Sequence, residues 1–374
     1  MILIAALTLL AALILAGATA FLASSTNVKV GSNYRLGETA LQVAMAGAEQ
    51  ARQTLRALNA SSSNPANFSE ELAGRVGSNG ALDGYNPSGS TDDLPLASSN
   101  SLLQGYTYTA YLTNDSVEGA SNTTDANGKV VITSVASGPN NAKAIVTTTV
   151  QLYTFPNNSP AVLYSKDNTT LNGSSITING NDAGNCSGSN VGGVYVYSEP
   201  PSNTHTLSQN GNPNITGNPP TQIGTTNLDL QSYVDALKAS ATITLTADVS
   251  APGNGTTSYG SASNYVTVYS DATQQTDGEL RLNNVTGYGI LLVKGNLQLA
   301  GNIDWHGIII ATGVVTASGG GSNSKNIQGQ IYSGASSLGD TTVSGSVTIG
   351  YNSCEVKKSL SSQPLKVVNW RQSY

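Results

Sequence analysis

The chain has 374 residues, of which only 10% are charged, with 40 glycines and a formal net charge of −6. This length allows two globular domains with separate cores, and low charge with abundant Gly, Ser, Thr and Asn is typical of a β-rich extracellular protein. Nucleic acid is not an expected partner, because its phosphates need clustered Lys and Arg, and the densest basic run is Lys357–Lys358.

The N-terminal segment is uncharged from Met1 to Ala23, and the first charge is Lys29. Twenty-three helical residues span about 34 Å, which matches the roughly 30 Å hydrocarbon core of a bilayer. The segment lacks the basic start of a secretory signal, so we expect the numbering to begin at a mature end, after a short basic leader. A helix that is apolar all round needs lipid or sister copies, and we expect these contacts from Met1, Ile2, Leu3, Ile4, Leu7, Leu9, Leu10, Leu13, Leu15, Phe21 and Leu22.

The helical pattern resumes after a polar passage at 24–34. Its apolar stripe recurs at spacings of three and four residues and consists of Leu41, Ala44, Ala48, Ala51, Leu55 and Leu58. Glycine costs about 1 kcal/mol relative to alanine in a helix, so Gly17, Gly31 and Gly37 predict that the helix is interrupted between Ser24 and Gly37. The run from Asn59 to Pro65 predicts its end.

A head with antiparallel strands is expected next. Residues 61–103 are predicted to form a long connecting loop with one helical turn, and strands are predicted at 106–112, 130–136 and 144–153, where apolar residues alternate. This meander buries one face on the preceding helix and ends near Pro156. The predicted domains are therefore the helix at 1–60, the head at 61–156 and a β-rich domain at 157–374.

The last of these domains shows short apolar runs separated by Gly, Asn and Ser every eight to twelve residues. Such spacing indicates a sandwich, a barrel or a β-helix, and a β-helix-like stack is favoured for 284–351. A helix is predicted at 228–239, capped by Asn227 or Asp229, and a final strand at 365–370 with Trp370 packed on the stack. The fold class is α+β: a long N-terminal α-helix packed on an antiparallel β-meander, followed by a β-rich, β-helix-like C-terminal domain.

The two cysteines are Cys186 and Cys354. In an oxidising compartment they would form one disulfide that closes a loop of about 168 residues. The alternative is a pair of unlinked buried thiols. No second Cys or His accompanies either residue, so no metal is expected there.

Candidate chemistry is sparse, and we expect neither an enzyme nor a cofactor. Asp304 and His306 share one strand face, which is compatible with an acid and base pair or with a surface pair. Turn oxygens at 179–182 suit calcium, although capped turns explain them equally. Strand tyrosines either line a sugar-binding face or pack in the core, namely Tyr106, Tyr108, Tyr111, Tyr195 and Tyr197. Glycosylation sequons occur at Asn67, Asn122, Asn168, Asn214, Asn254 and Asn284.

Two stretches resemble the type IV pilin-like proteins of the PilX-type minor pilin group. One is A-M-A-G-A-E-Q-A at Ala44–Ala51, with Met45 where the group commonly has Glu, and the other is the Gly-rich strand run from Gly287 to Gly313. The resemblance implies a leader cut by a prepilin peptidase, an N-methylated Met1 and a filament core of bundled helices. Pilins usually carry Glu at the fifth mature position, and Ala5 stands there, which favours a minor or tip role without excluding a main subunit.

The resemblance therefore implies a structural subunit of a type IV pilus or related filament, held in the inner membrane before assembly and in an extracellular filament afterwards. Its expected partners are copies of itself or other pilins, the pilus assembly machinery, the peptidase and, as candidates, surface glycans. Two alternatives stay open. One is a minor tip pilin or adhesin that primes assembly, and the other is a membrane-tethered β-helix protein that never polymerises.

Overall fold

The computed structural model describes residues 2–62, 67–88, 91–103, 105–152, 159–184, 186, 188–201, 203–251, 255–319, 324–337 and 339–373. Contacts divide the chain into two compact units. Unit 1 comprises Met1–Leu55, Phe68–Gln151 and Val367–Tyr374, and unit 2 comprises Arg56–Asn67 and Leu152–Lys366. The predicted helix end at Pro65 and the predicted head boundary at Pro156 lie outside the described residues.

The helix α1 (Ile2–Ser61) is continuous over 60 residues. The expected interruption between Ser24 and Gly37 is therefore wrong. Gly17, Gly31 and Gly37 are more than one helical turn apart, with better helix formers between them, so their separate costs of about 1 kcal/mol do not accumulate at one point. The hydroxyls of the polar passage do not take backbone N–H groups from the helix, since Thr26 Oγ1 donates to the Leu22 carbonyl at 2.8 Å.

The sheet of unit 1 has the strand order β1–β2–β3–β4–β22. The pairs β1–β2, β2–β3 and β3–β4 are antiparallel, which confirms the predicted meander. The elements of this unit besides α1 are α2 (Ser69–Ala73), β1 (Ala97–Leu103), β2 (Tyr106–Asn114), β3 (Lys129–Ser137), η1 (Pro139–Asn141), β4 (Lys143–Gln151) and β22 (Lys366–Ser373). The strand β1 lies where a connecting loop was expected, because its sequence ASSNSLL shows no alternation of apolar and polar residues.

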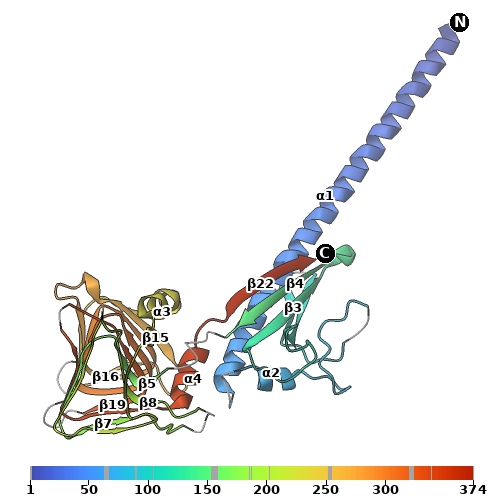
Figure 1. The fold of residues 1–374 in the computed structure, drawn as a ribbon. Coiled ribbons are helices and arrows are strands. Elements are labelled where there is room, and N and C mark those ends of the chain that lie inside the picture. The colour runs from blue at the N-terminus through green and yellow to red at the C-terminus, as the bar shows by residue number, and fades with distance from the viewer. Residues whose placement is uncertain are drawn as a thin grey trace. The chain divides into compact units, whose positions relative to one another are not determined.

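The second half of α1 covers one face of this sheet, while its first half extends beyond the strands (Figure 1). Burial alternates along β2, β3 and β4, so every second side chain faces the helix. The shared core combines small helix residues with two large aromatic rings, and its buried members are Ala40, Leu41, Val43, Ala44, Ala48, Tyr106, Tyr108, Ala136, Ala144 and Val146. The alanine stripe thus allows the close approach that the tyrosine rings require.

Gly47 lies where this approach is tightest. A Cβ atom there would sit 2.5 Å from Ser134 Oγ and 2.5 Å from Tyr108 Cδ2. We expect Gly47→Ala to lower the free energy of unfolding of unit 1 by about 1–2 kcal/mol, because overpacking outweighs the gain in helix propensity. The matched control is Gly37→Ala, where the new methyl meets nothing within 4 Å and should stabilise the helix. Thermal unfolding followed by circular dichroism in detergent compares the two variants, and equal midpoints would contradict this account of the packing.

The last strand corrects one expectation. The predicted final strand exists as β22. Trp370 was expected to pack on the C-terminal stack, but β22 lies beside β4 in the sheet of unit 1. Trp370 is 45% exposed there. The placement was wrong because a strand's alternation indicates which face is buried but not which edge it will pair with.

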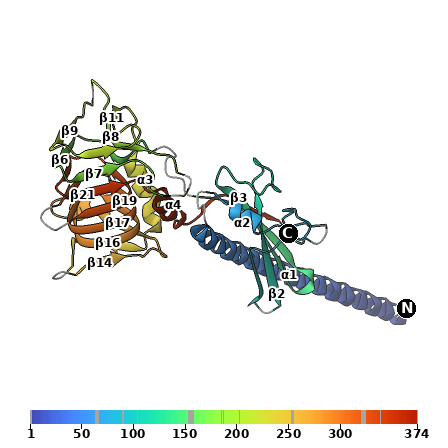
Figure 2. The same cartoon turned by 90° about the horizontal axis from the view of Figure 1, so that it is seen from below.

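Unit 2 is a curled sheet of parallel strands (Figure 2). Its strands are β5 (Ala161–Ser165), β6 (Thr169–Asn172), β7 (Ile176–Asn179), β8 (Gly192–Tyr197), β9 (Leu207–Asn210), β10 (Asn214–Thr216), β11 (Thr221–Gly224), β12 (Ile243–Leu245), β13 (Val249–Ser250), β14 (Thr257–Tyr259), β15 (Val266–Asp271), β16 (Glu279–Lys294), β17 (Asn296–Ala311), β18 (Val315–Ser318), β19 (Lys325–Ser333), β20 (Thr341–Ser344) and β21 (Val347–Gly350). The parallel pairings among the described residues form three ladders. They run through β5–β8–β11, through β6–β9 and through β7–β10, and each continues into later strands.

The order of the strands in this sheet differs from their order along the chain. The chain first winds outward from β5 to β11, passes through α3 (Leu230–Leu237) and η2 (Lys238–Ser240), and then winds from β12 to β21. The last turn of this second run pairs with the first turn of the first run, through β19–β5, β20–β6 and β21–β7. The parallel sheet therefore begins well before residue 284, where the stack was predicted to start.

The interior of unit 2 is filled by aliphatic side chains and by the fully buried Trp305. Space for its ring exists because Gly287, its partner on the neighbouring strand, has no side chain; a Cβ there would lie 2.1 Å from the ring. Two positions further along the strands, three glycines pair with one another across the ladder: Gly289, Gly307 and Gly329, all with positive φ. These glycines allow successive strands to bend at the same place.

Two helices pack outside the curled sheet. The N-cap of α3 is Asp229, whose carboxylate accepts from the Ser232 N–H. Asp229 was one of the two predicted caps. Leu230, Val234 and Leu237 of α3 are buried against outward tyrosines such as Tyr164. The helix α4 (Ser353–Ser361) follows β21, and the short η3 (Ala272–Gln274) follows β15.

Candidate membrane and filament-core segment

The first half of α1 presents large apolar side chains on all sides. Of the residues predicted to contact lipid or sister copies, those whose side chains are described are 58–78% exposed: Leu3, Ile4, Leu7, Leu9, Leu10, Leu13, Leu15, Phe21 and Leu22. Met1 lies outside the described residues, and so do the side chains of Ile2 and Ala5, although both belong to α1. The described part of the predicted segment therefore does not pack on its own chain.

Ile14 belongs to the same surface, with 64% of its area exposed, and the sequence prediction omitted it. The uncharged run alone is enough to identify Ile14, because every side chain of a helix that is exposed on all sides faces outward. Beyond the run, Val28, Val30 and Tyr34 are also exposed. They alternate with polar residues and the exposed Lys29, so the continuous apolar surface ends near Ala23.

This surface is long enough for a bilayer. A window of 18 residues within α1 is apolar enough to cross a membrane, and none of that window is buried within the chain. Removing one large apolar side chain from water stabilises by roughly 1.5–3 kcal/mol. Ten such side chains would together contribute on the order of 20 kcal/mol, so the segment needs an apolar environment.

The two cysteines are joined by a disulfide, with a sulfur–sulfur distance of 2.06 Å. It fixes the N-terminal turn of α4 to the connection between β7 and β8. Lys357 Nζ of the same helix donates to the Cys186 carbonyl. Asp182 adds two bonds, because its carboxylate accepts from Ser353 N–H at 2.8 Å and from Ser353 Oγ at 2.7 Å.

These contacts also account for the turn oxygens considered for calcium at 179–182. The Asp182 carboxylate accepts a further bond from the Gly184 N–H, and Asn179 Oδ1 accepts from Asn181 N–H and Thr216 Oγ1. The side chains therefore cap turns and hold α4.

Asp304 and His306 are close together, with Nε2 of the histidine 3.5 Å from Asp304 Oδ1. The other ring nitrogen lies 3.7 Å from Glu355 Oε2 of α4, and the ring stacks on Tyr288 with centroids 4.4 Å apart. Tyr265 also donates to Glu355. The pair thus belongs to a packed contact between the sheet and α4.

The tyrosines considered for a binding face do not form one. Tyr106, Tyr108, Tyr195 and Tyr197 are at most 5% exposed, so that suggestion was wrong for them and the packing alternative holds. Tyr111 is half-buried and stacks near Tyr85 with centroids 6.4 Å apart.

Of the sequon asparagines, Asn122 and Asn214 are exposed, while Asn67, Asn168 and Asn284 are intermediate. Asn254 lies outside the described residues.

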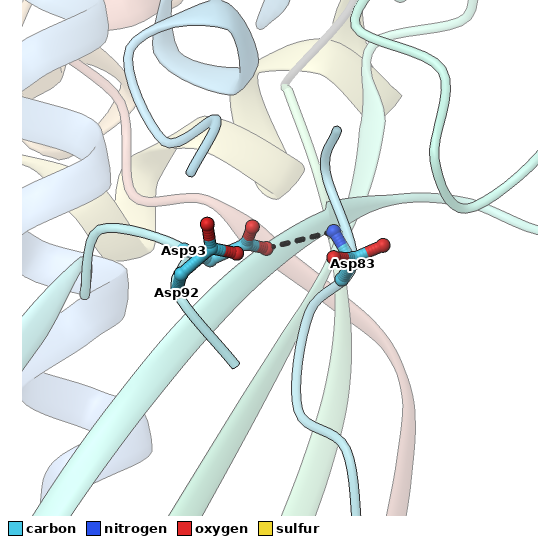
Figure 3. A group of neighbouring side chains, drawn as sticks. All are labelled: Asp83, Asp92 and Asp93. Carbon is cyan, nitrogen blue, oxygen red and sulfur yellow. Dashed lines mark hydrogen bonds between the residues drawn. The ribbon is translucent and has the colours of Figure 1, made fainter. Parts of the chain in front are cut away.

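One group was not singled out from the sequence. Asp83, Asp92 and Asp93 belong to the segment that joins α2 to β1, and their side chains lie close together (Figure 3). No metal-binding motif has their spacing, and the available signal was only three aspartates within a Gly-rich stretch.

Comparisons with known proteins give little. No family model matches the chain, and no curated protein matches it. Among solved structures, the competence-associated pilin ComZ from Thermus thermophilus aligns with 78% of this chain and 86% of its own, at 11% identity and a TM-score of 0.25. A superposition at that score carries no argument, so the functional conclusion depends on the chain's own features.

Proposed function

We propose that this protein is a pilin-like structural subunit of a type IV pilus or related extracellular filament. The observation that carries the proposal is the division of α1 into two halves. The second half packs its alanine stripe on its own sheet, whereas the first half exposes large apolar side chains on every side. Such a helix can exchange lipid for equivalent helices of other subunits at little net cost, because lipid tails are about as apolar as leucine.

In this proposal the segment up to Ala23 holds the subunit in the inner membrane and then enters a bundle of like helices, while the rest of unit 1 and the whole of unit 2 remain outside. Processing by a prepilin peptidase, methylation of Met1 and extraction by an assembly machinery are part of the same proposal. The stacked parallel ladders of unit 2 support a β-helix-like surface domain. The proposal includes no catalytic role, and surface glycans remain candidate partners.

A photo-crosslinking amino acid placed in α1 tests the proposal in native filaments. At position 10, in place of the exposed Leu10, we expect adducts between two subunits. At position 48, in place of Ala48, which is buried against the chain's own sheet, we expect adducts within one subunit. Adducts at position 10 with lipid alone would contradict the filament proposal and favour the membrane-tethered alternative.

A second measurement separates a main subunit from a tip subunit. Antibodies against unit 2 should label fibres along their length if the protein is a main subunit. Labelling at one end only would establish the minor tip role that Ala5 favours.

A further inference from the structure

Two neighbouring chain segments of unit 1 bring three carboxylates together. Residues 77–84 form a tight turn, in which the Gly77 N–H donates to the Ala81 carbonyl, and the segment that follows Thr91 returns beside them, with the Leu94 N–H donating to the Arg75 carbonyl. The carboxylates of Asp92 and Asp93 face Asp83 across this gap (Figure 3). One oxygen from each residue lies within 4.8 Å of the others.

Each carboxylate is held in place through one of its oxygens. Asp93 Oδ2 accepts from the Asp83 and Gly84 N–H groups at 2.9 and 2.6 Å. Asp92 Oδ2 accepts from Ser78 Oγ and the Asn79 N–H at 2.7 and 2.8 Å. Asp83 Oδ2 accepts from Asn79 Nδ2 at 2.7 Å.

The second oxygen of Asp93, Oδ1, is the evidence for a bound ligand. Asp93 is only 5% exposed, and in the described part of the chain no donor bonds to its buried Oδ1. None of the ion pairs found among the described residues involves Asp83, Asp92 or Asp93. A buried carboxylate oxygen with neither a donor nor a counter-charge is strongly disfavoured. Its carboxylate also has one oxygen within 4.8 Å of an oxygen of each of the other two aspartates.

We propose that Asp83, Asp92 and Asp93 bind a calcium ion that ties the segment 77–84 to the segment 91–94. Oxygens that surround Ca²⁺ at 2.3–2.6 Å are up to about 5 Å apart, which agrees with the observed separation. Calcium tolerates irregular sites that combine carboxylates with carbonyls and water, whereas Mg²⁺ requires a regular octahedron. Asp83 and Asp92 are exposed, which leaves room for water to complete the shell.

Calorimetric titration of the full-length, EDTA-treated chain in detergent with CaCl₂ tests the site. We expect one saturable site with a dissociation constant of about 10⁻⁴ to 10⁻³ M, the range of extracellular calcium modules. Asp93→Asn should weaken binding at least tenfold. An asparagine oxygen can still accept from the Asp83 and Gly84 N–H groups, but an NH₂ group then replaces the buried anionic oxygen.

The matched control is Asp340→Asn, which removes one exposed carboxylate in unit 2 and should leave calcium binding unchanged. Wild-type affinity in Asp93→Asn, or no saturable calcium heat in the wild type, would overturn the site. Tighter binding of MgCl₂ than of CaCl₂ would overturn the choice of calcium. Should Asp93→Asn misfold by circular dichroism, the exposed Asp92→Asn decides instead, with an expected fivefold or greater loss of affinity.

Discussion

Replacing Leu13 by arginine is expected to release the protein from the membrane. Leu13 lies near the middle of the uncharged segment and is 63% exposed, so in a bilayer its side chain would face hydrocarbon. On insertion scales an arginine at the centre of a spanning helix is about 3 kcal/mol less favourable than leucine, or roughly a hundredfold in partition. The structure shows one helix able to span a membrane among the described residues, so no second span compensates for the loss there.

The measurement is the fraction of the chain that sediments with membranes after an alkaline wash, together with fibre yield. Thr26→Arg is the control, since Thr26 lies beyond the apolar run and close to Lys29, where an arginine reaches the headgroups. We expect Thr26→Arg to stay membrane-bound. If Leu13→Arg were retained equally well, the segment would not be the anchor.

Gly307→Ala is expected to destabilise unit 2 by about 3–5 kcal/mol, as the sum of backbone strain and overpacking. Gly307 has a φ of +131°, and a Cβ atom there would lie 2.2 Å from the Gly289 carbonyl oxygen and 2.2 Å from Ser359 Oγ. The backbone cannot easily move away from the Gly289 carbonyl, because Gly307 pairs on both sides, with Gly289 and Gly329.

Denaturant unfolding followed by fluorescence isolates this effect. The chain has two tryptophans; Trp305 is buried in unit 2 and Trp370 belongs to unit 1, so a Trp370→Phe background reports on Trp305 alone. Gly339→Ala is the control, since a Cβ there meets nothing within 4 Å. Equal midpoints for the two variants would show that the glycine row does not constrain the curled sheet.

The apolar segment and the meander were predictable from sequence because each depends on a local signal. The absence of charge before Lys29 is enough to identify the first, and the alternation in β2, β3 and β4 is enough to identify the second. The short apolar runs of unit 2 likewise indicate stacked strands, since their aliphatic side chains pack in or against one interior core.

The pairing of distant strands was not predictable. Period-two alternation assigns side chains to faces, but it does not say that β22 joins β4 or that β21 stacks on β7. The three aspartates were missed for a similar reason. Asp83 meets Asp92 and Asp93 only because the loop returns, and the unpaired Asp93 oxygen becomes visible only after burial is known.

The route of the chain has a consequence for resistance to proteases. The main segment of unit 2, Leu152–Lys366, is inserted between β4 and β22, and its Cys186–Cys354 bond closes a ring between residues 168 positions apart. A single cut inside that ring leaves one covalently continuous molecule, whose two pieces separate only after reduction. An extracellular fibre built from such subunits would keep its surface domains after being nicked by a neighbour's protease.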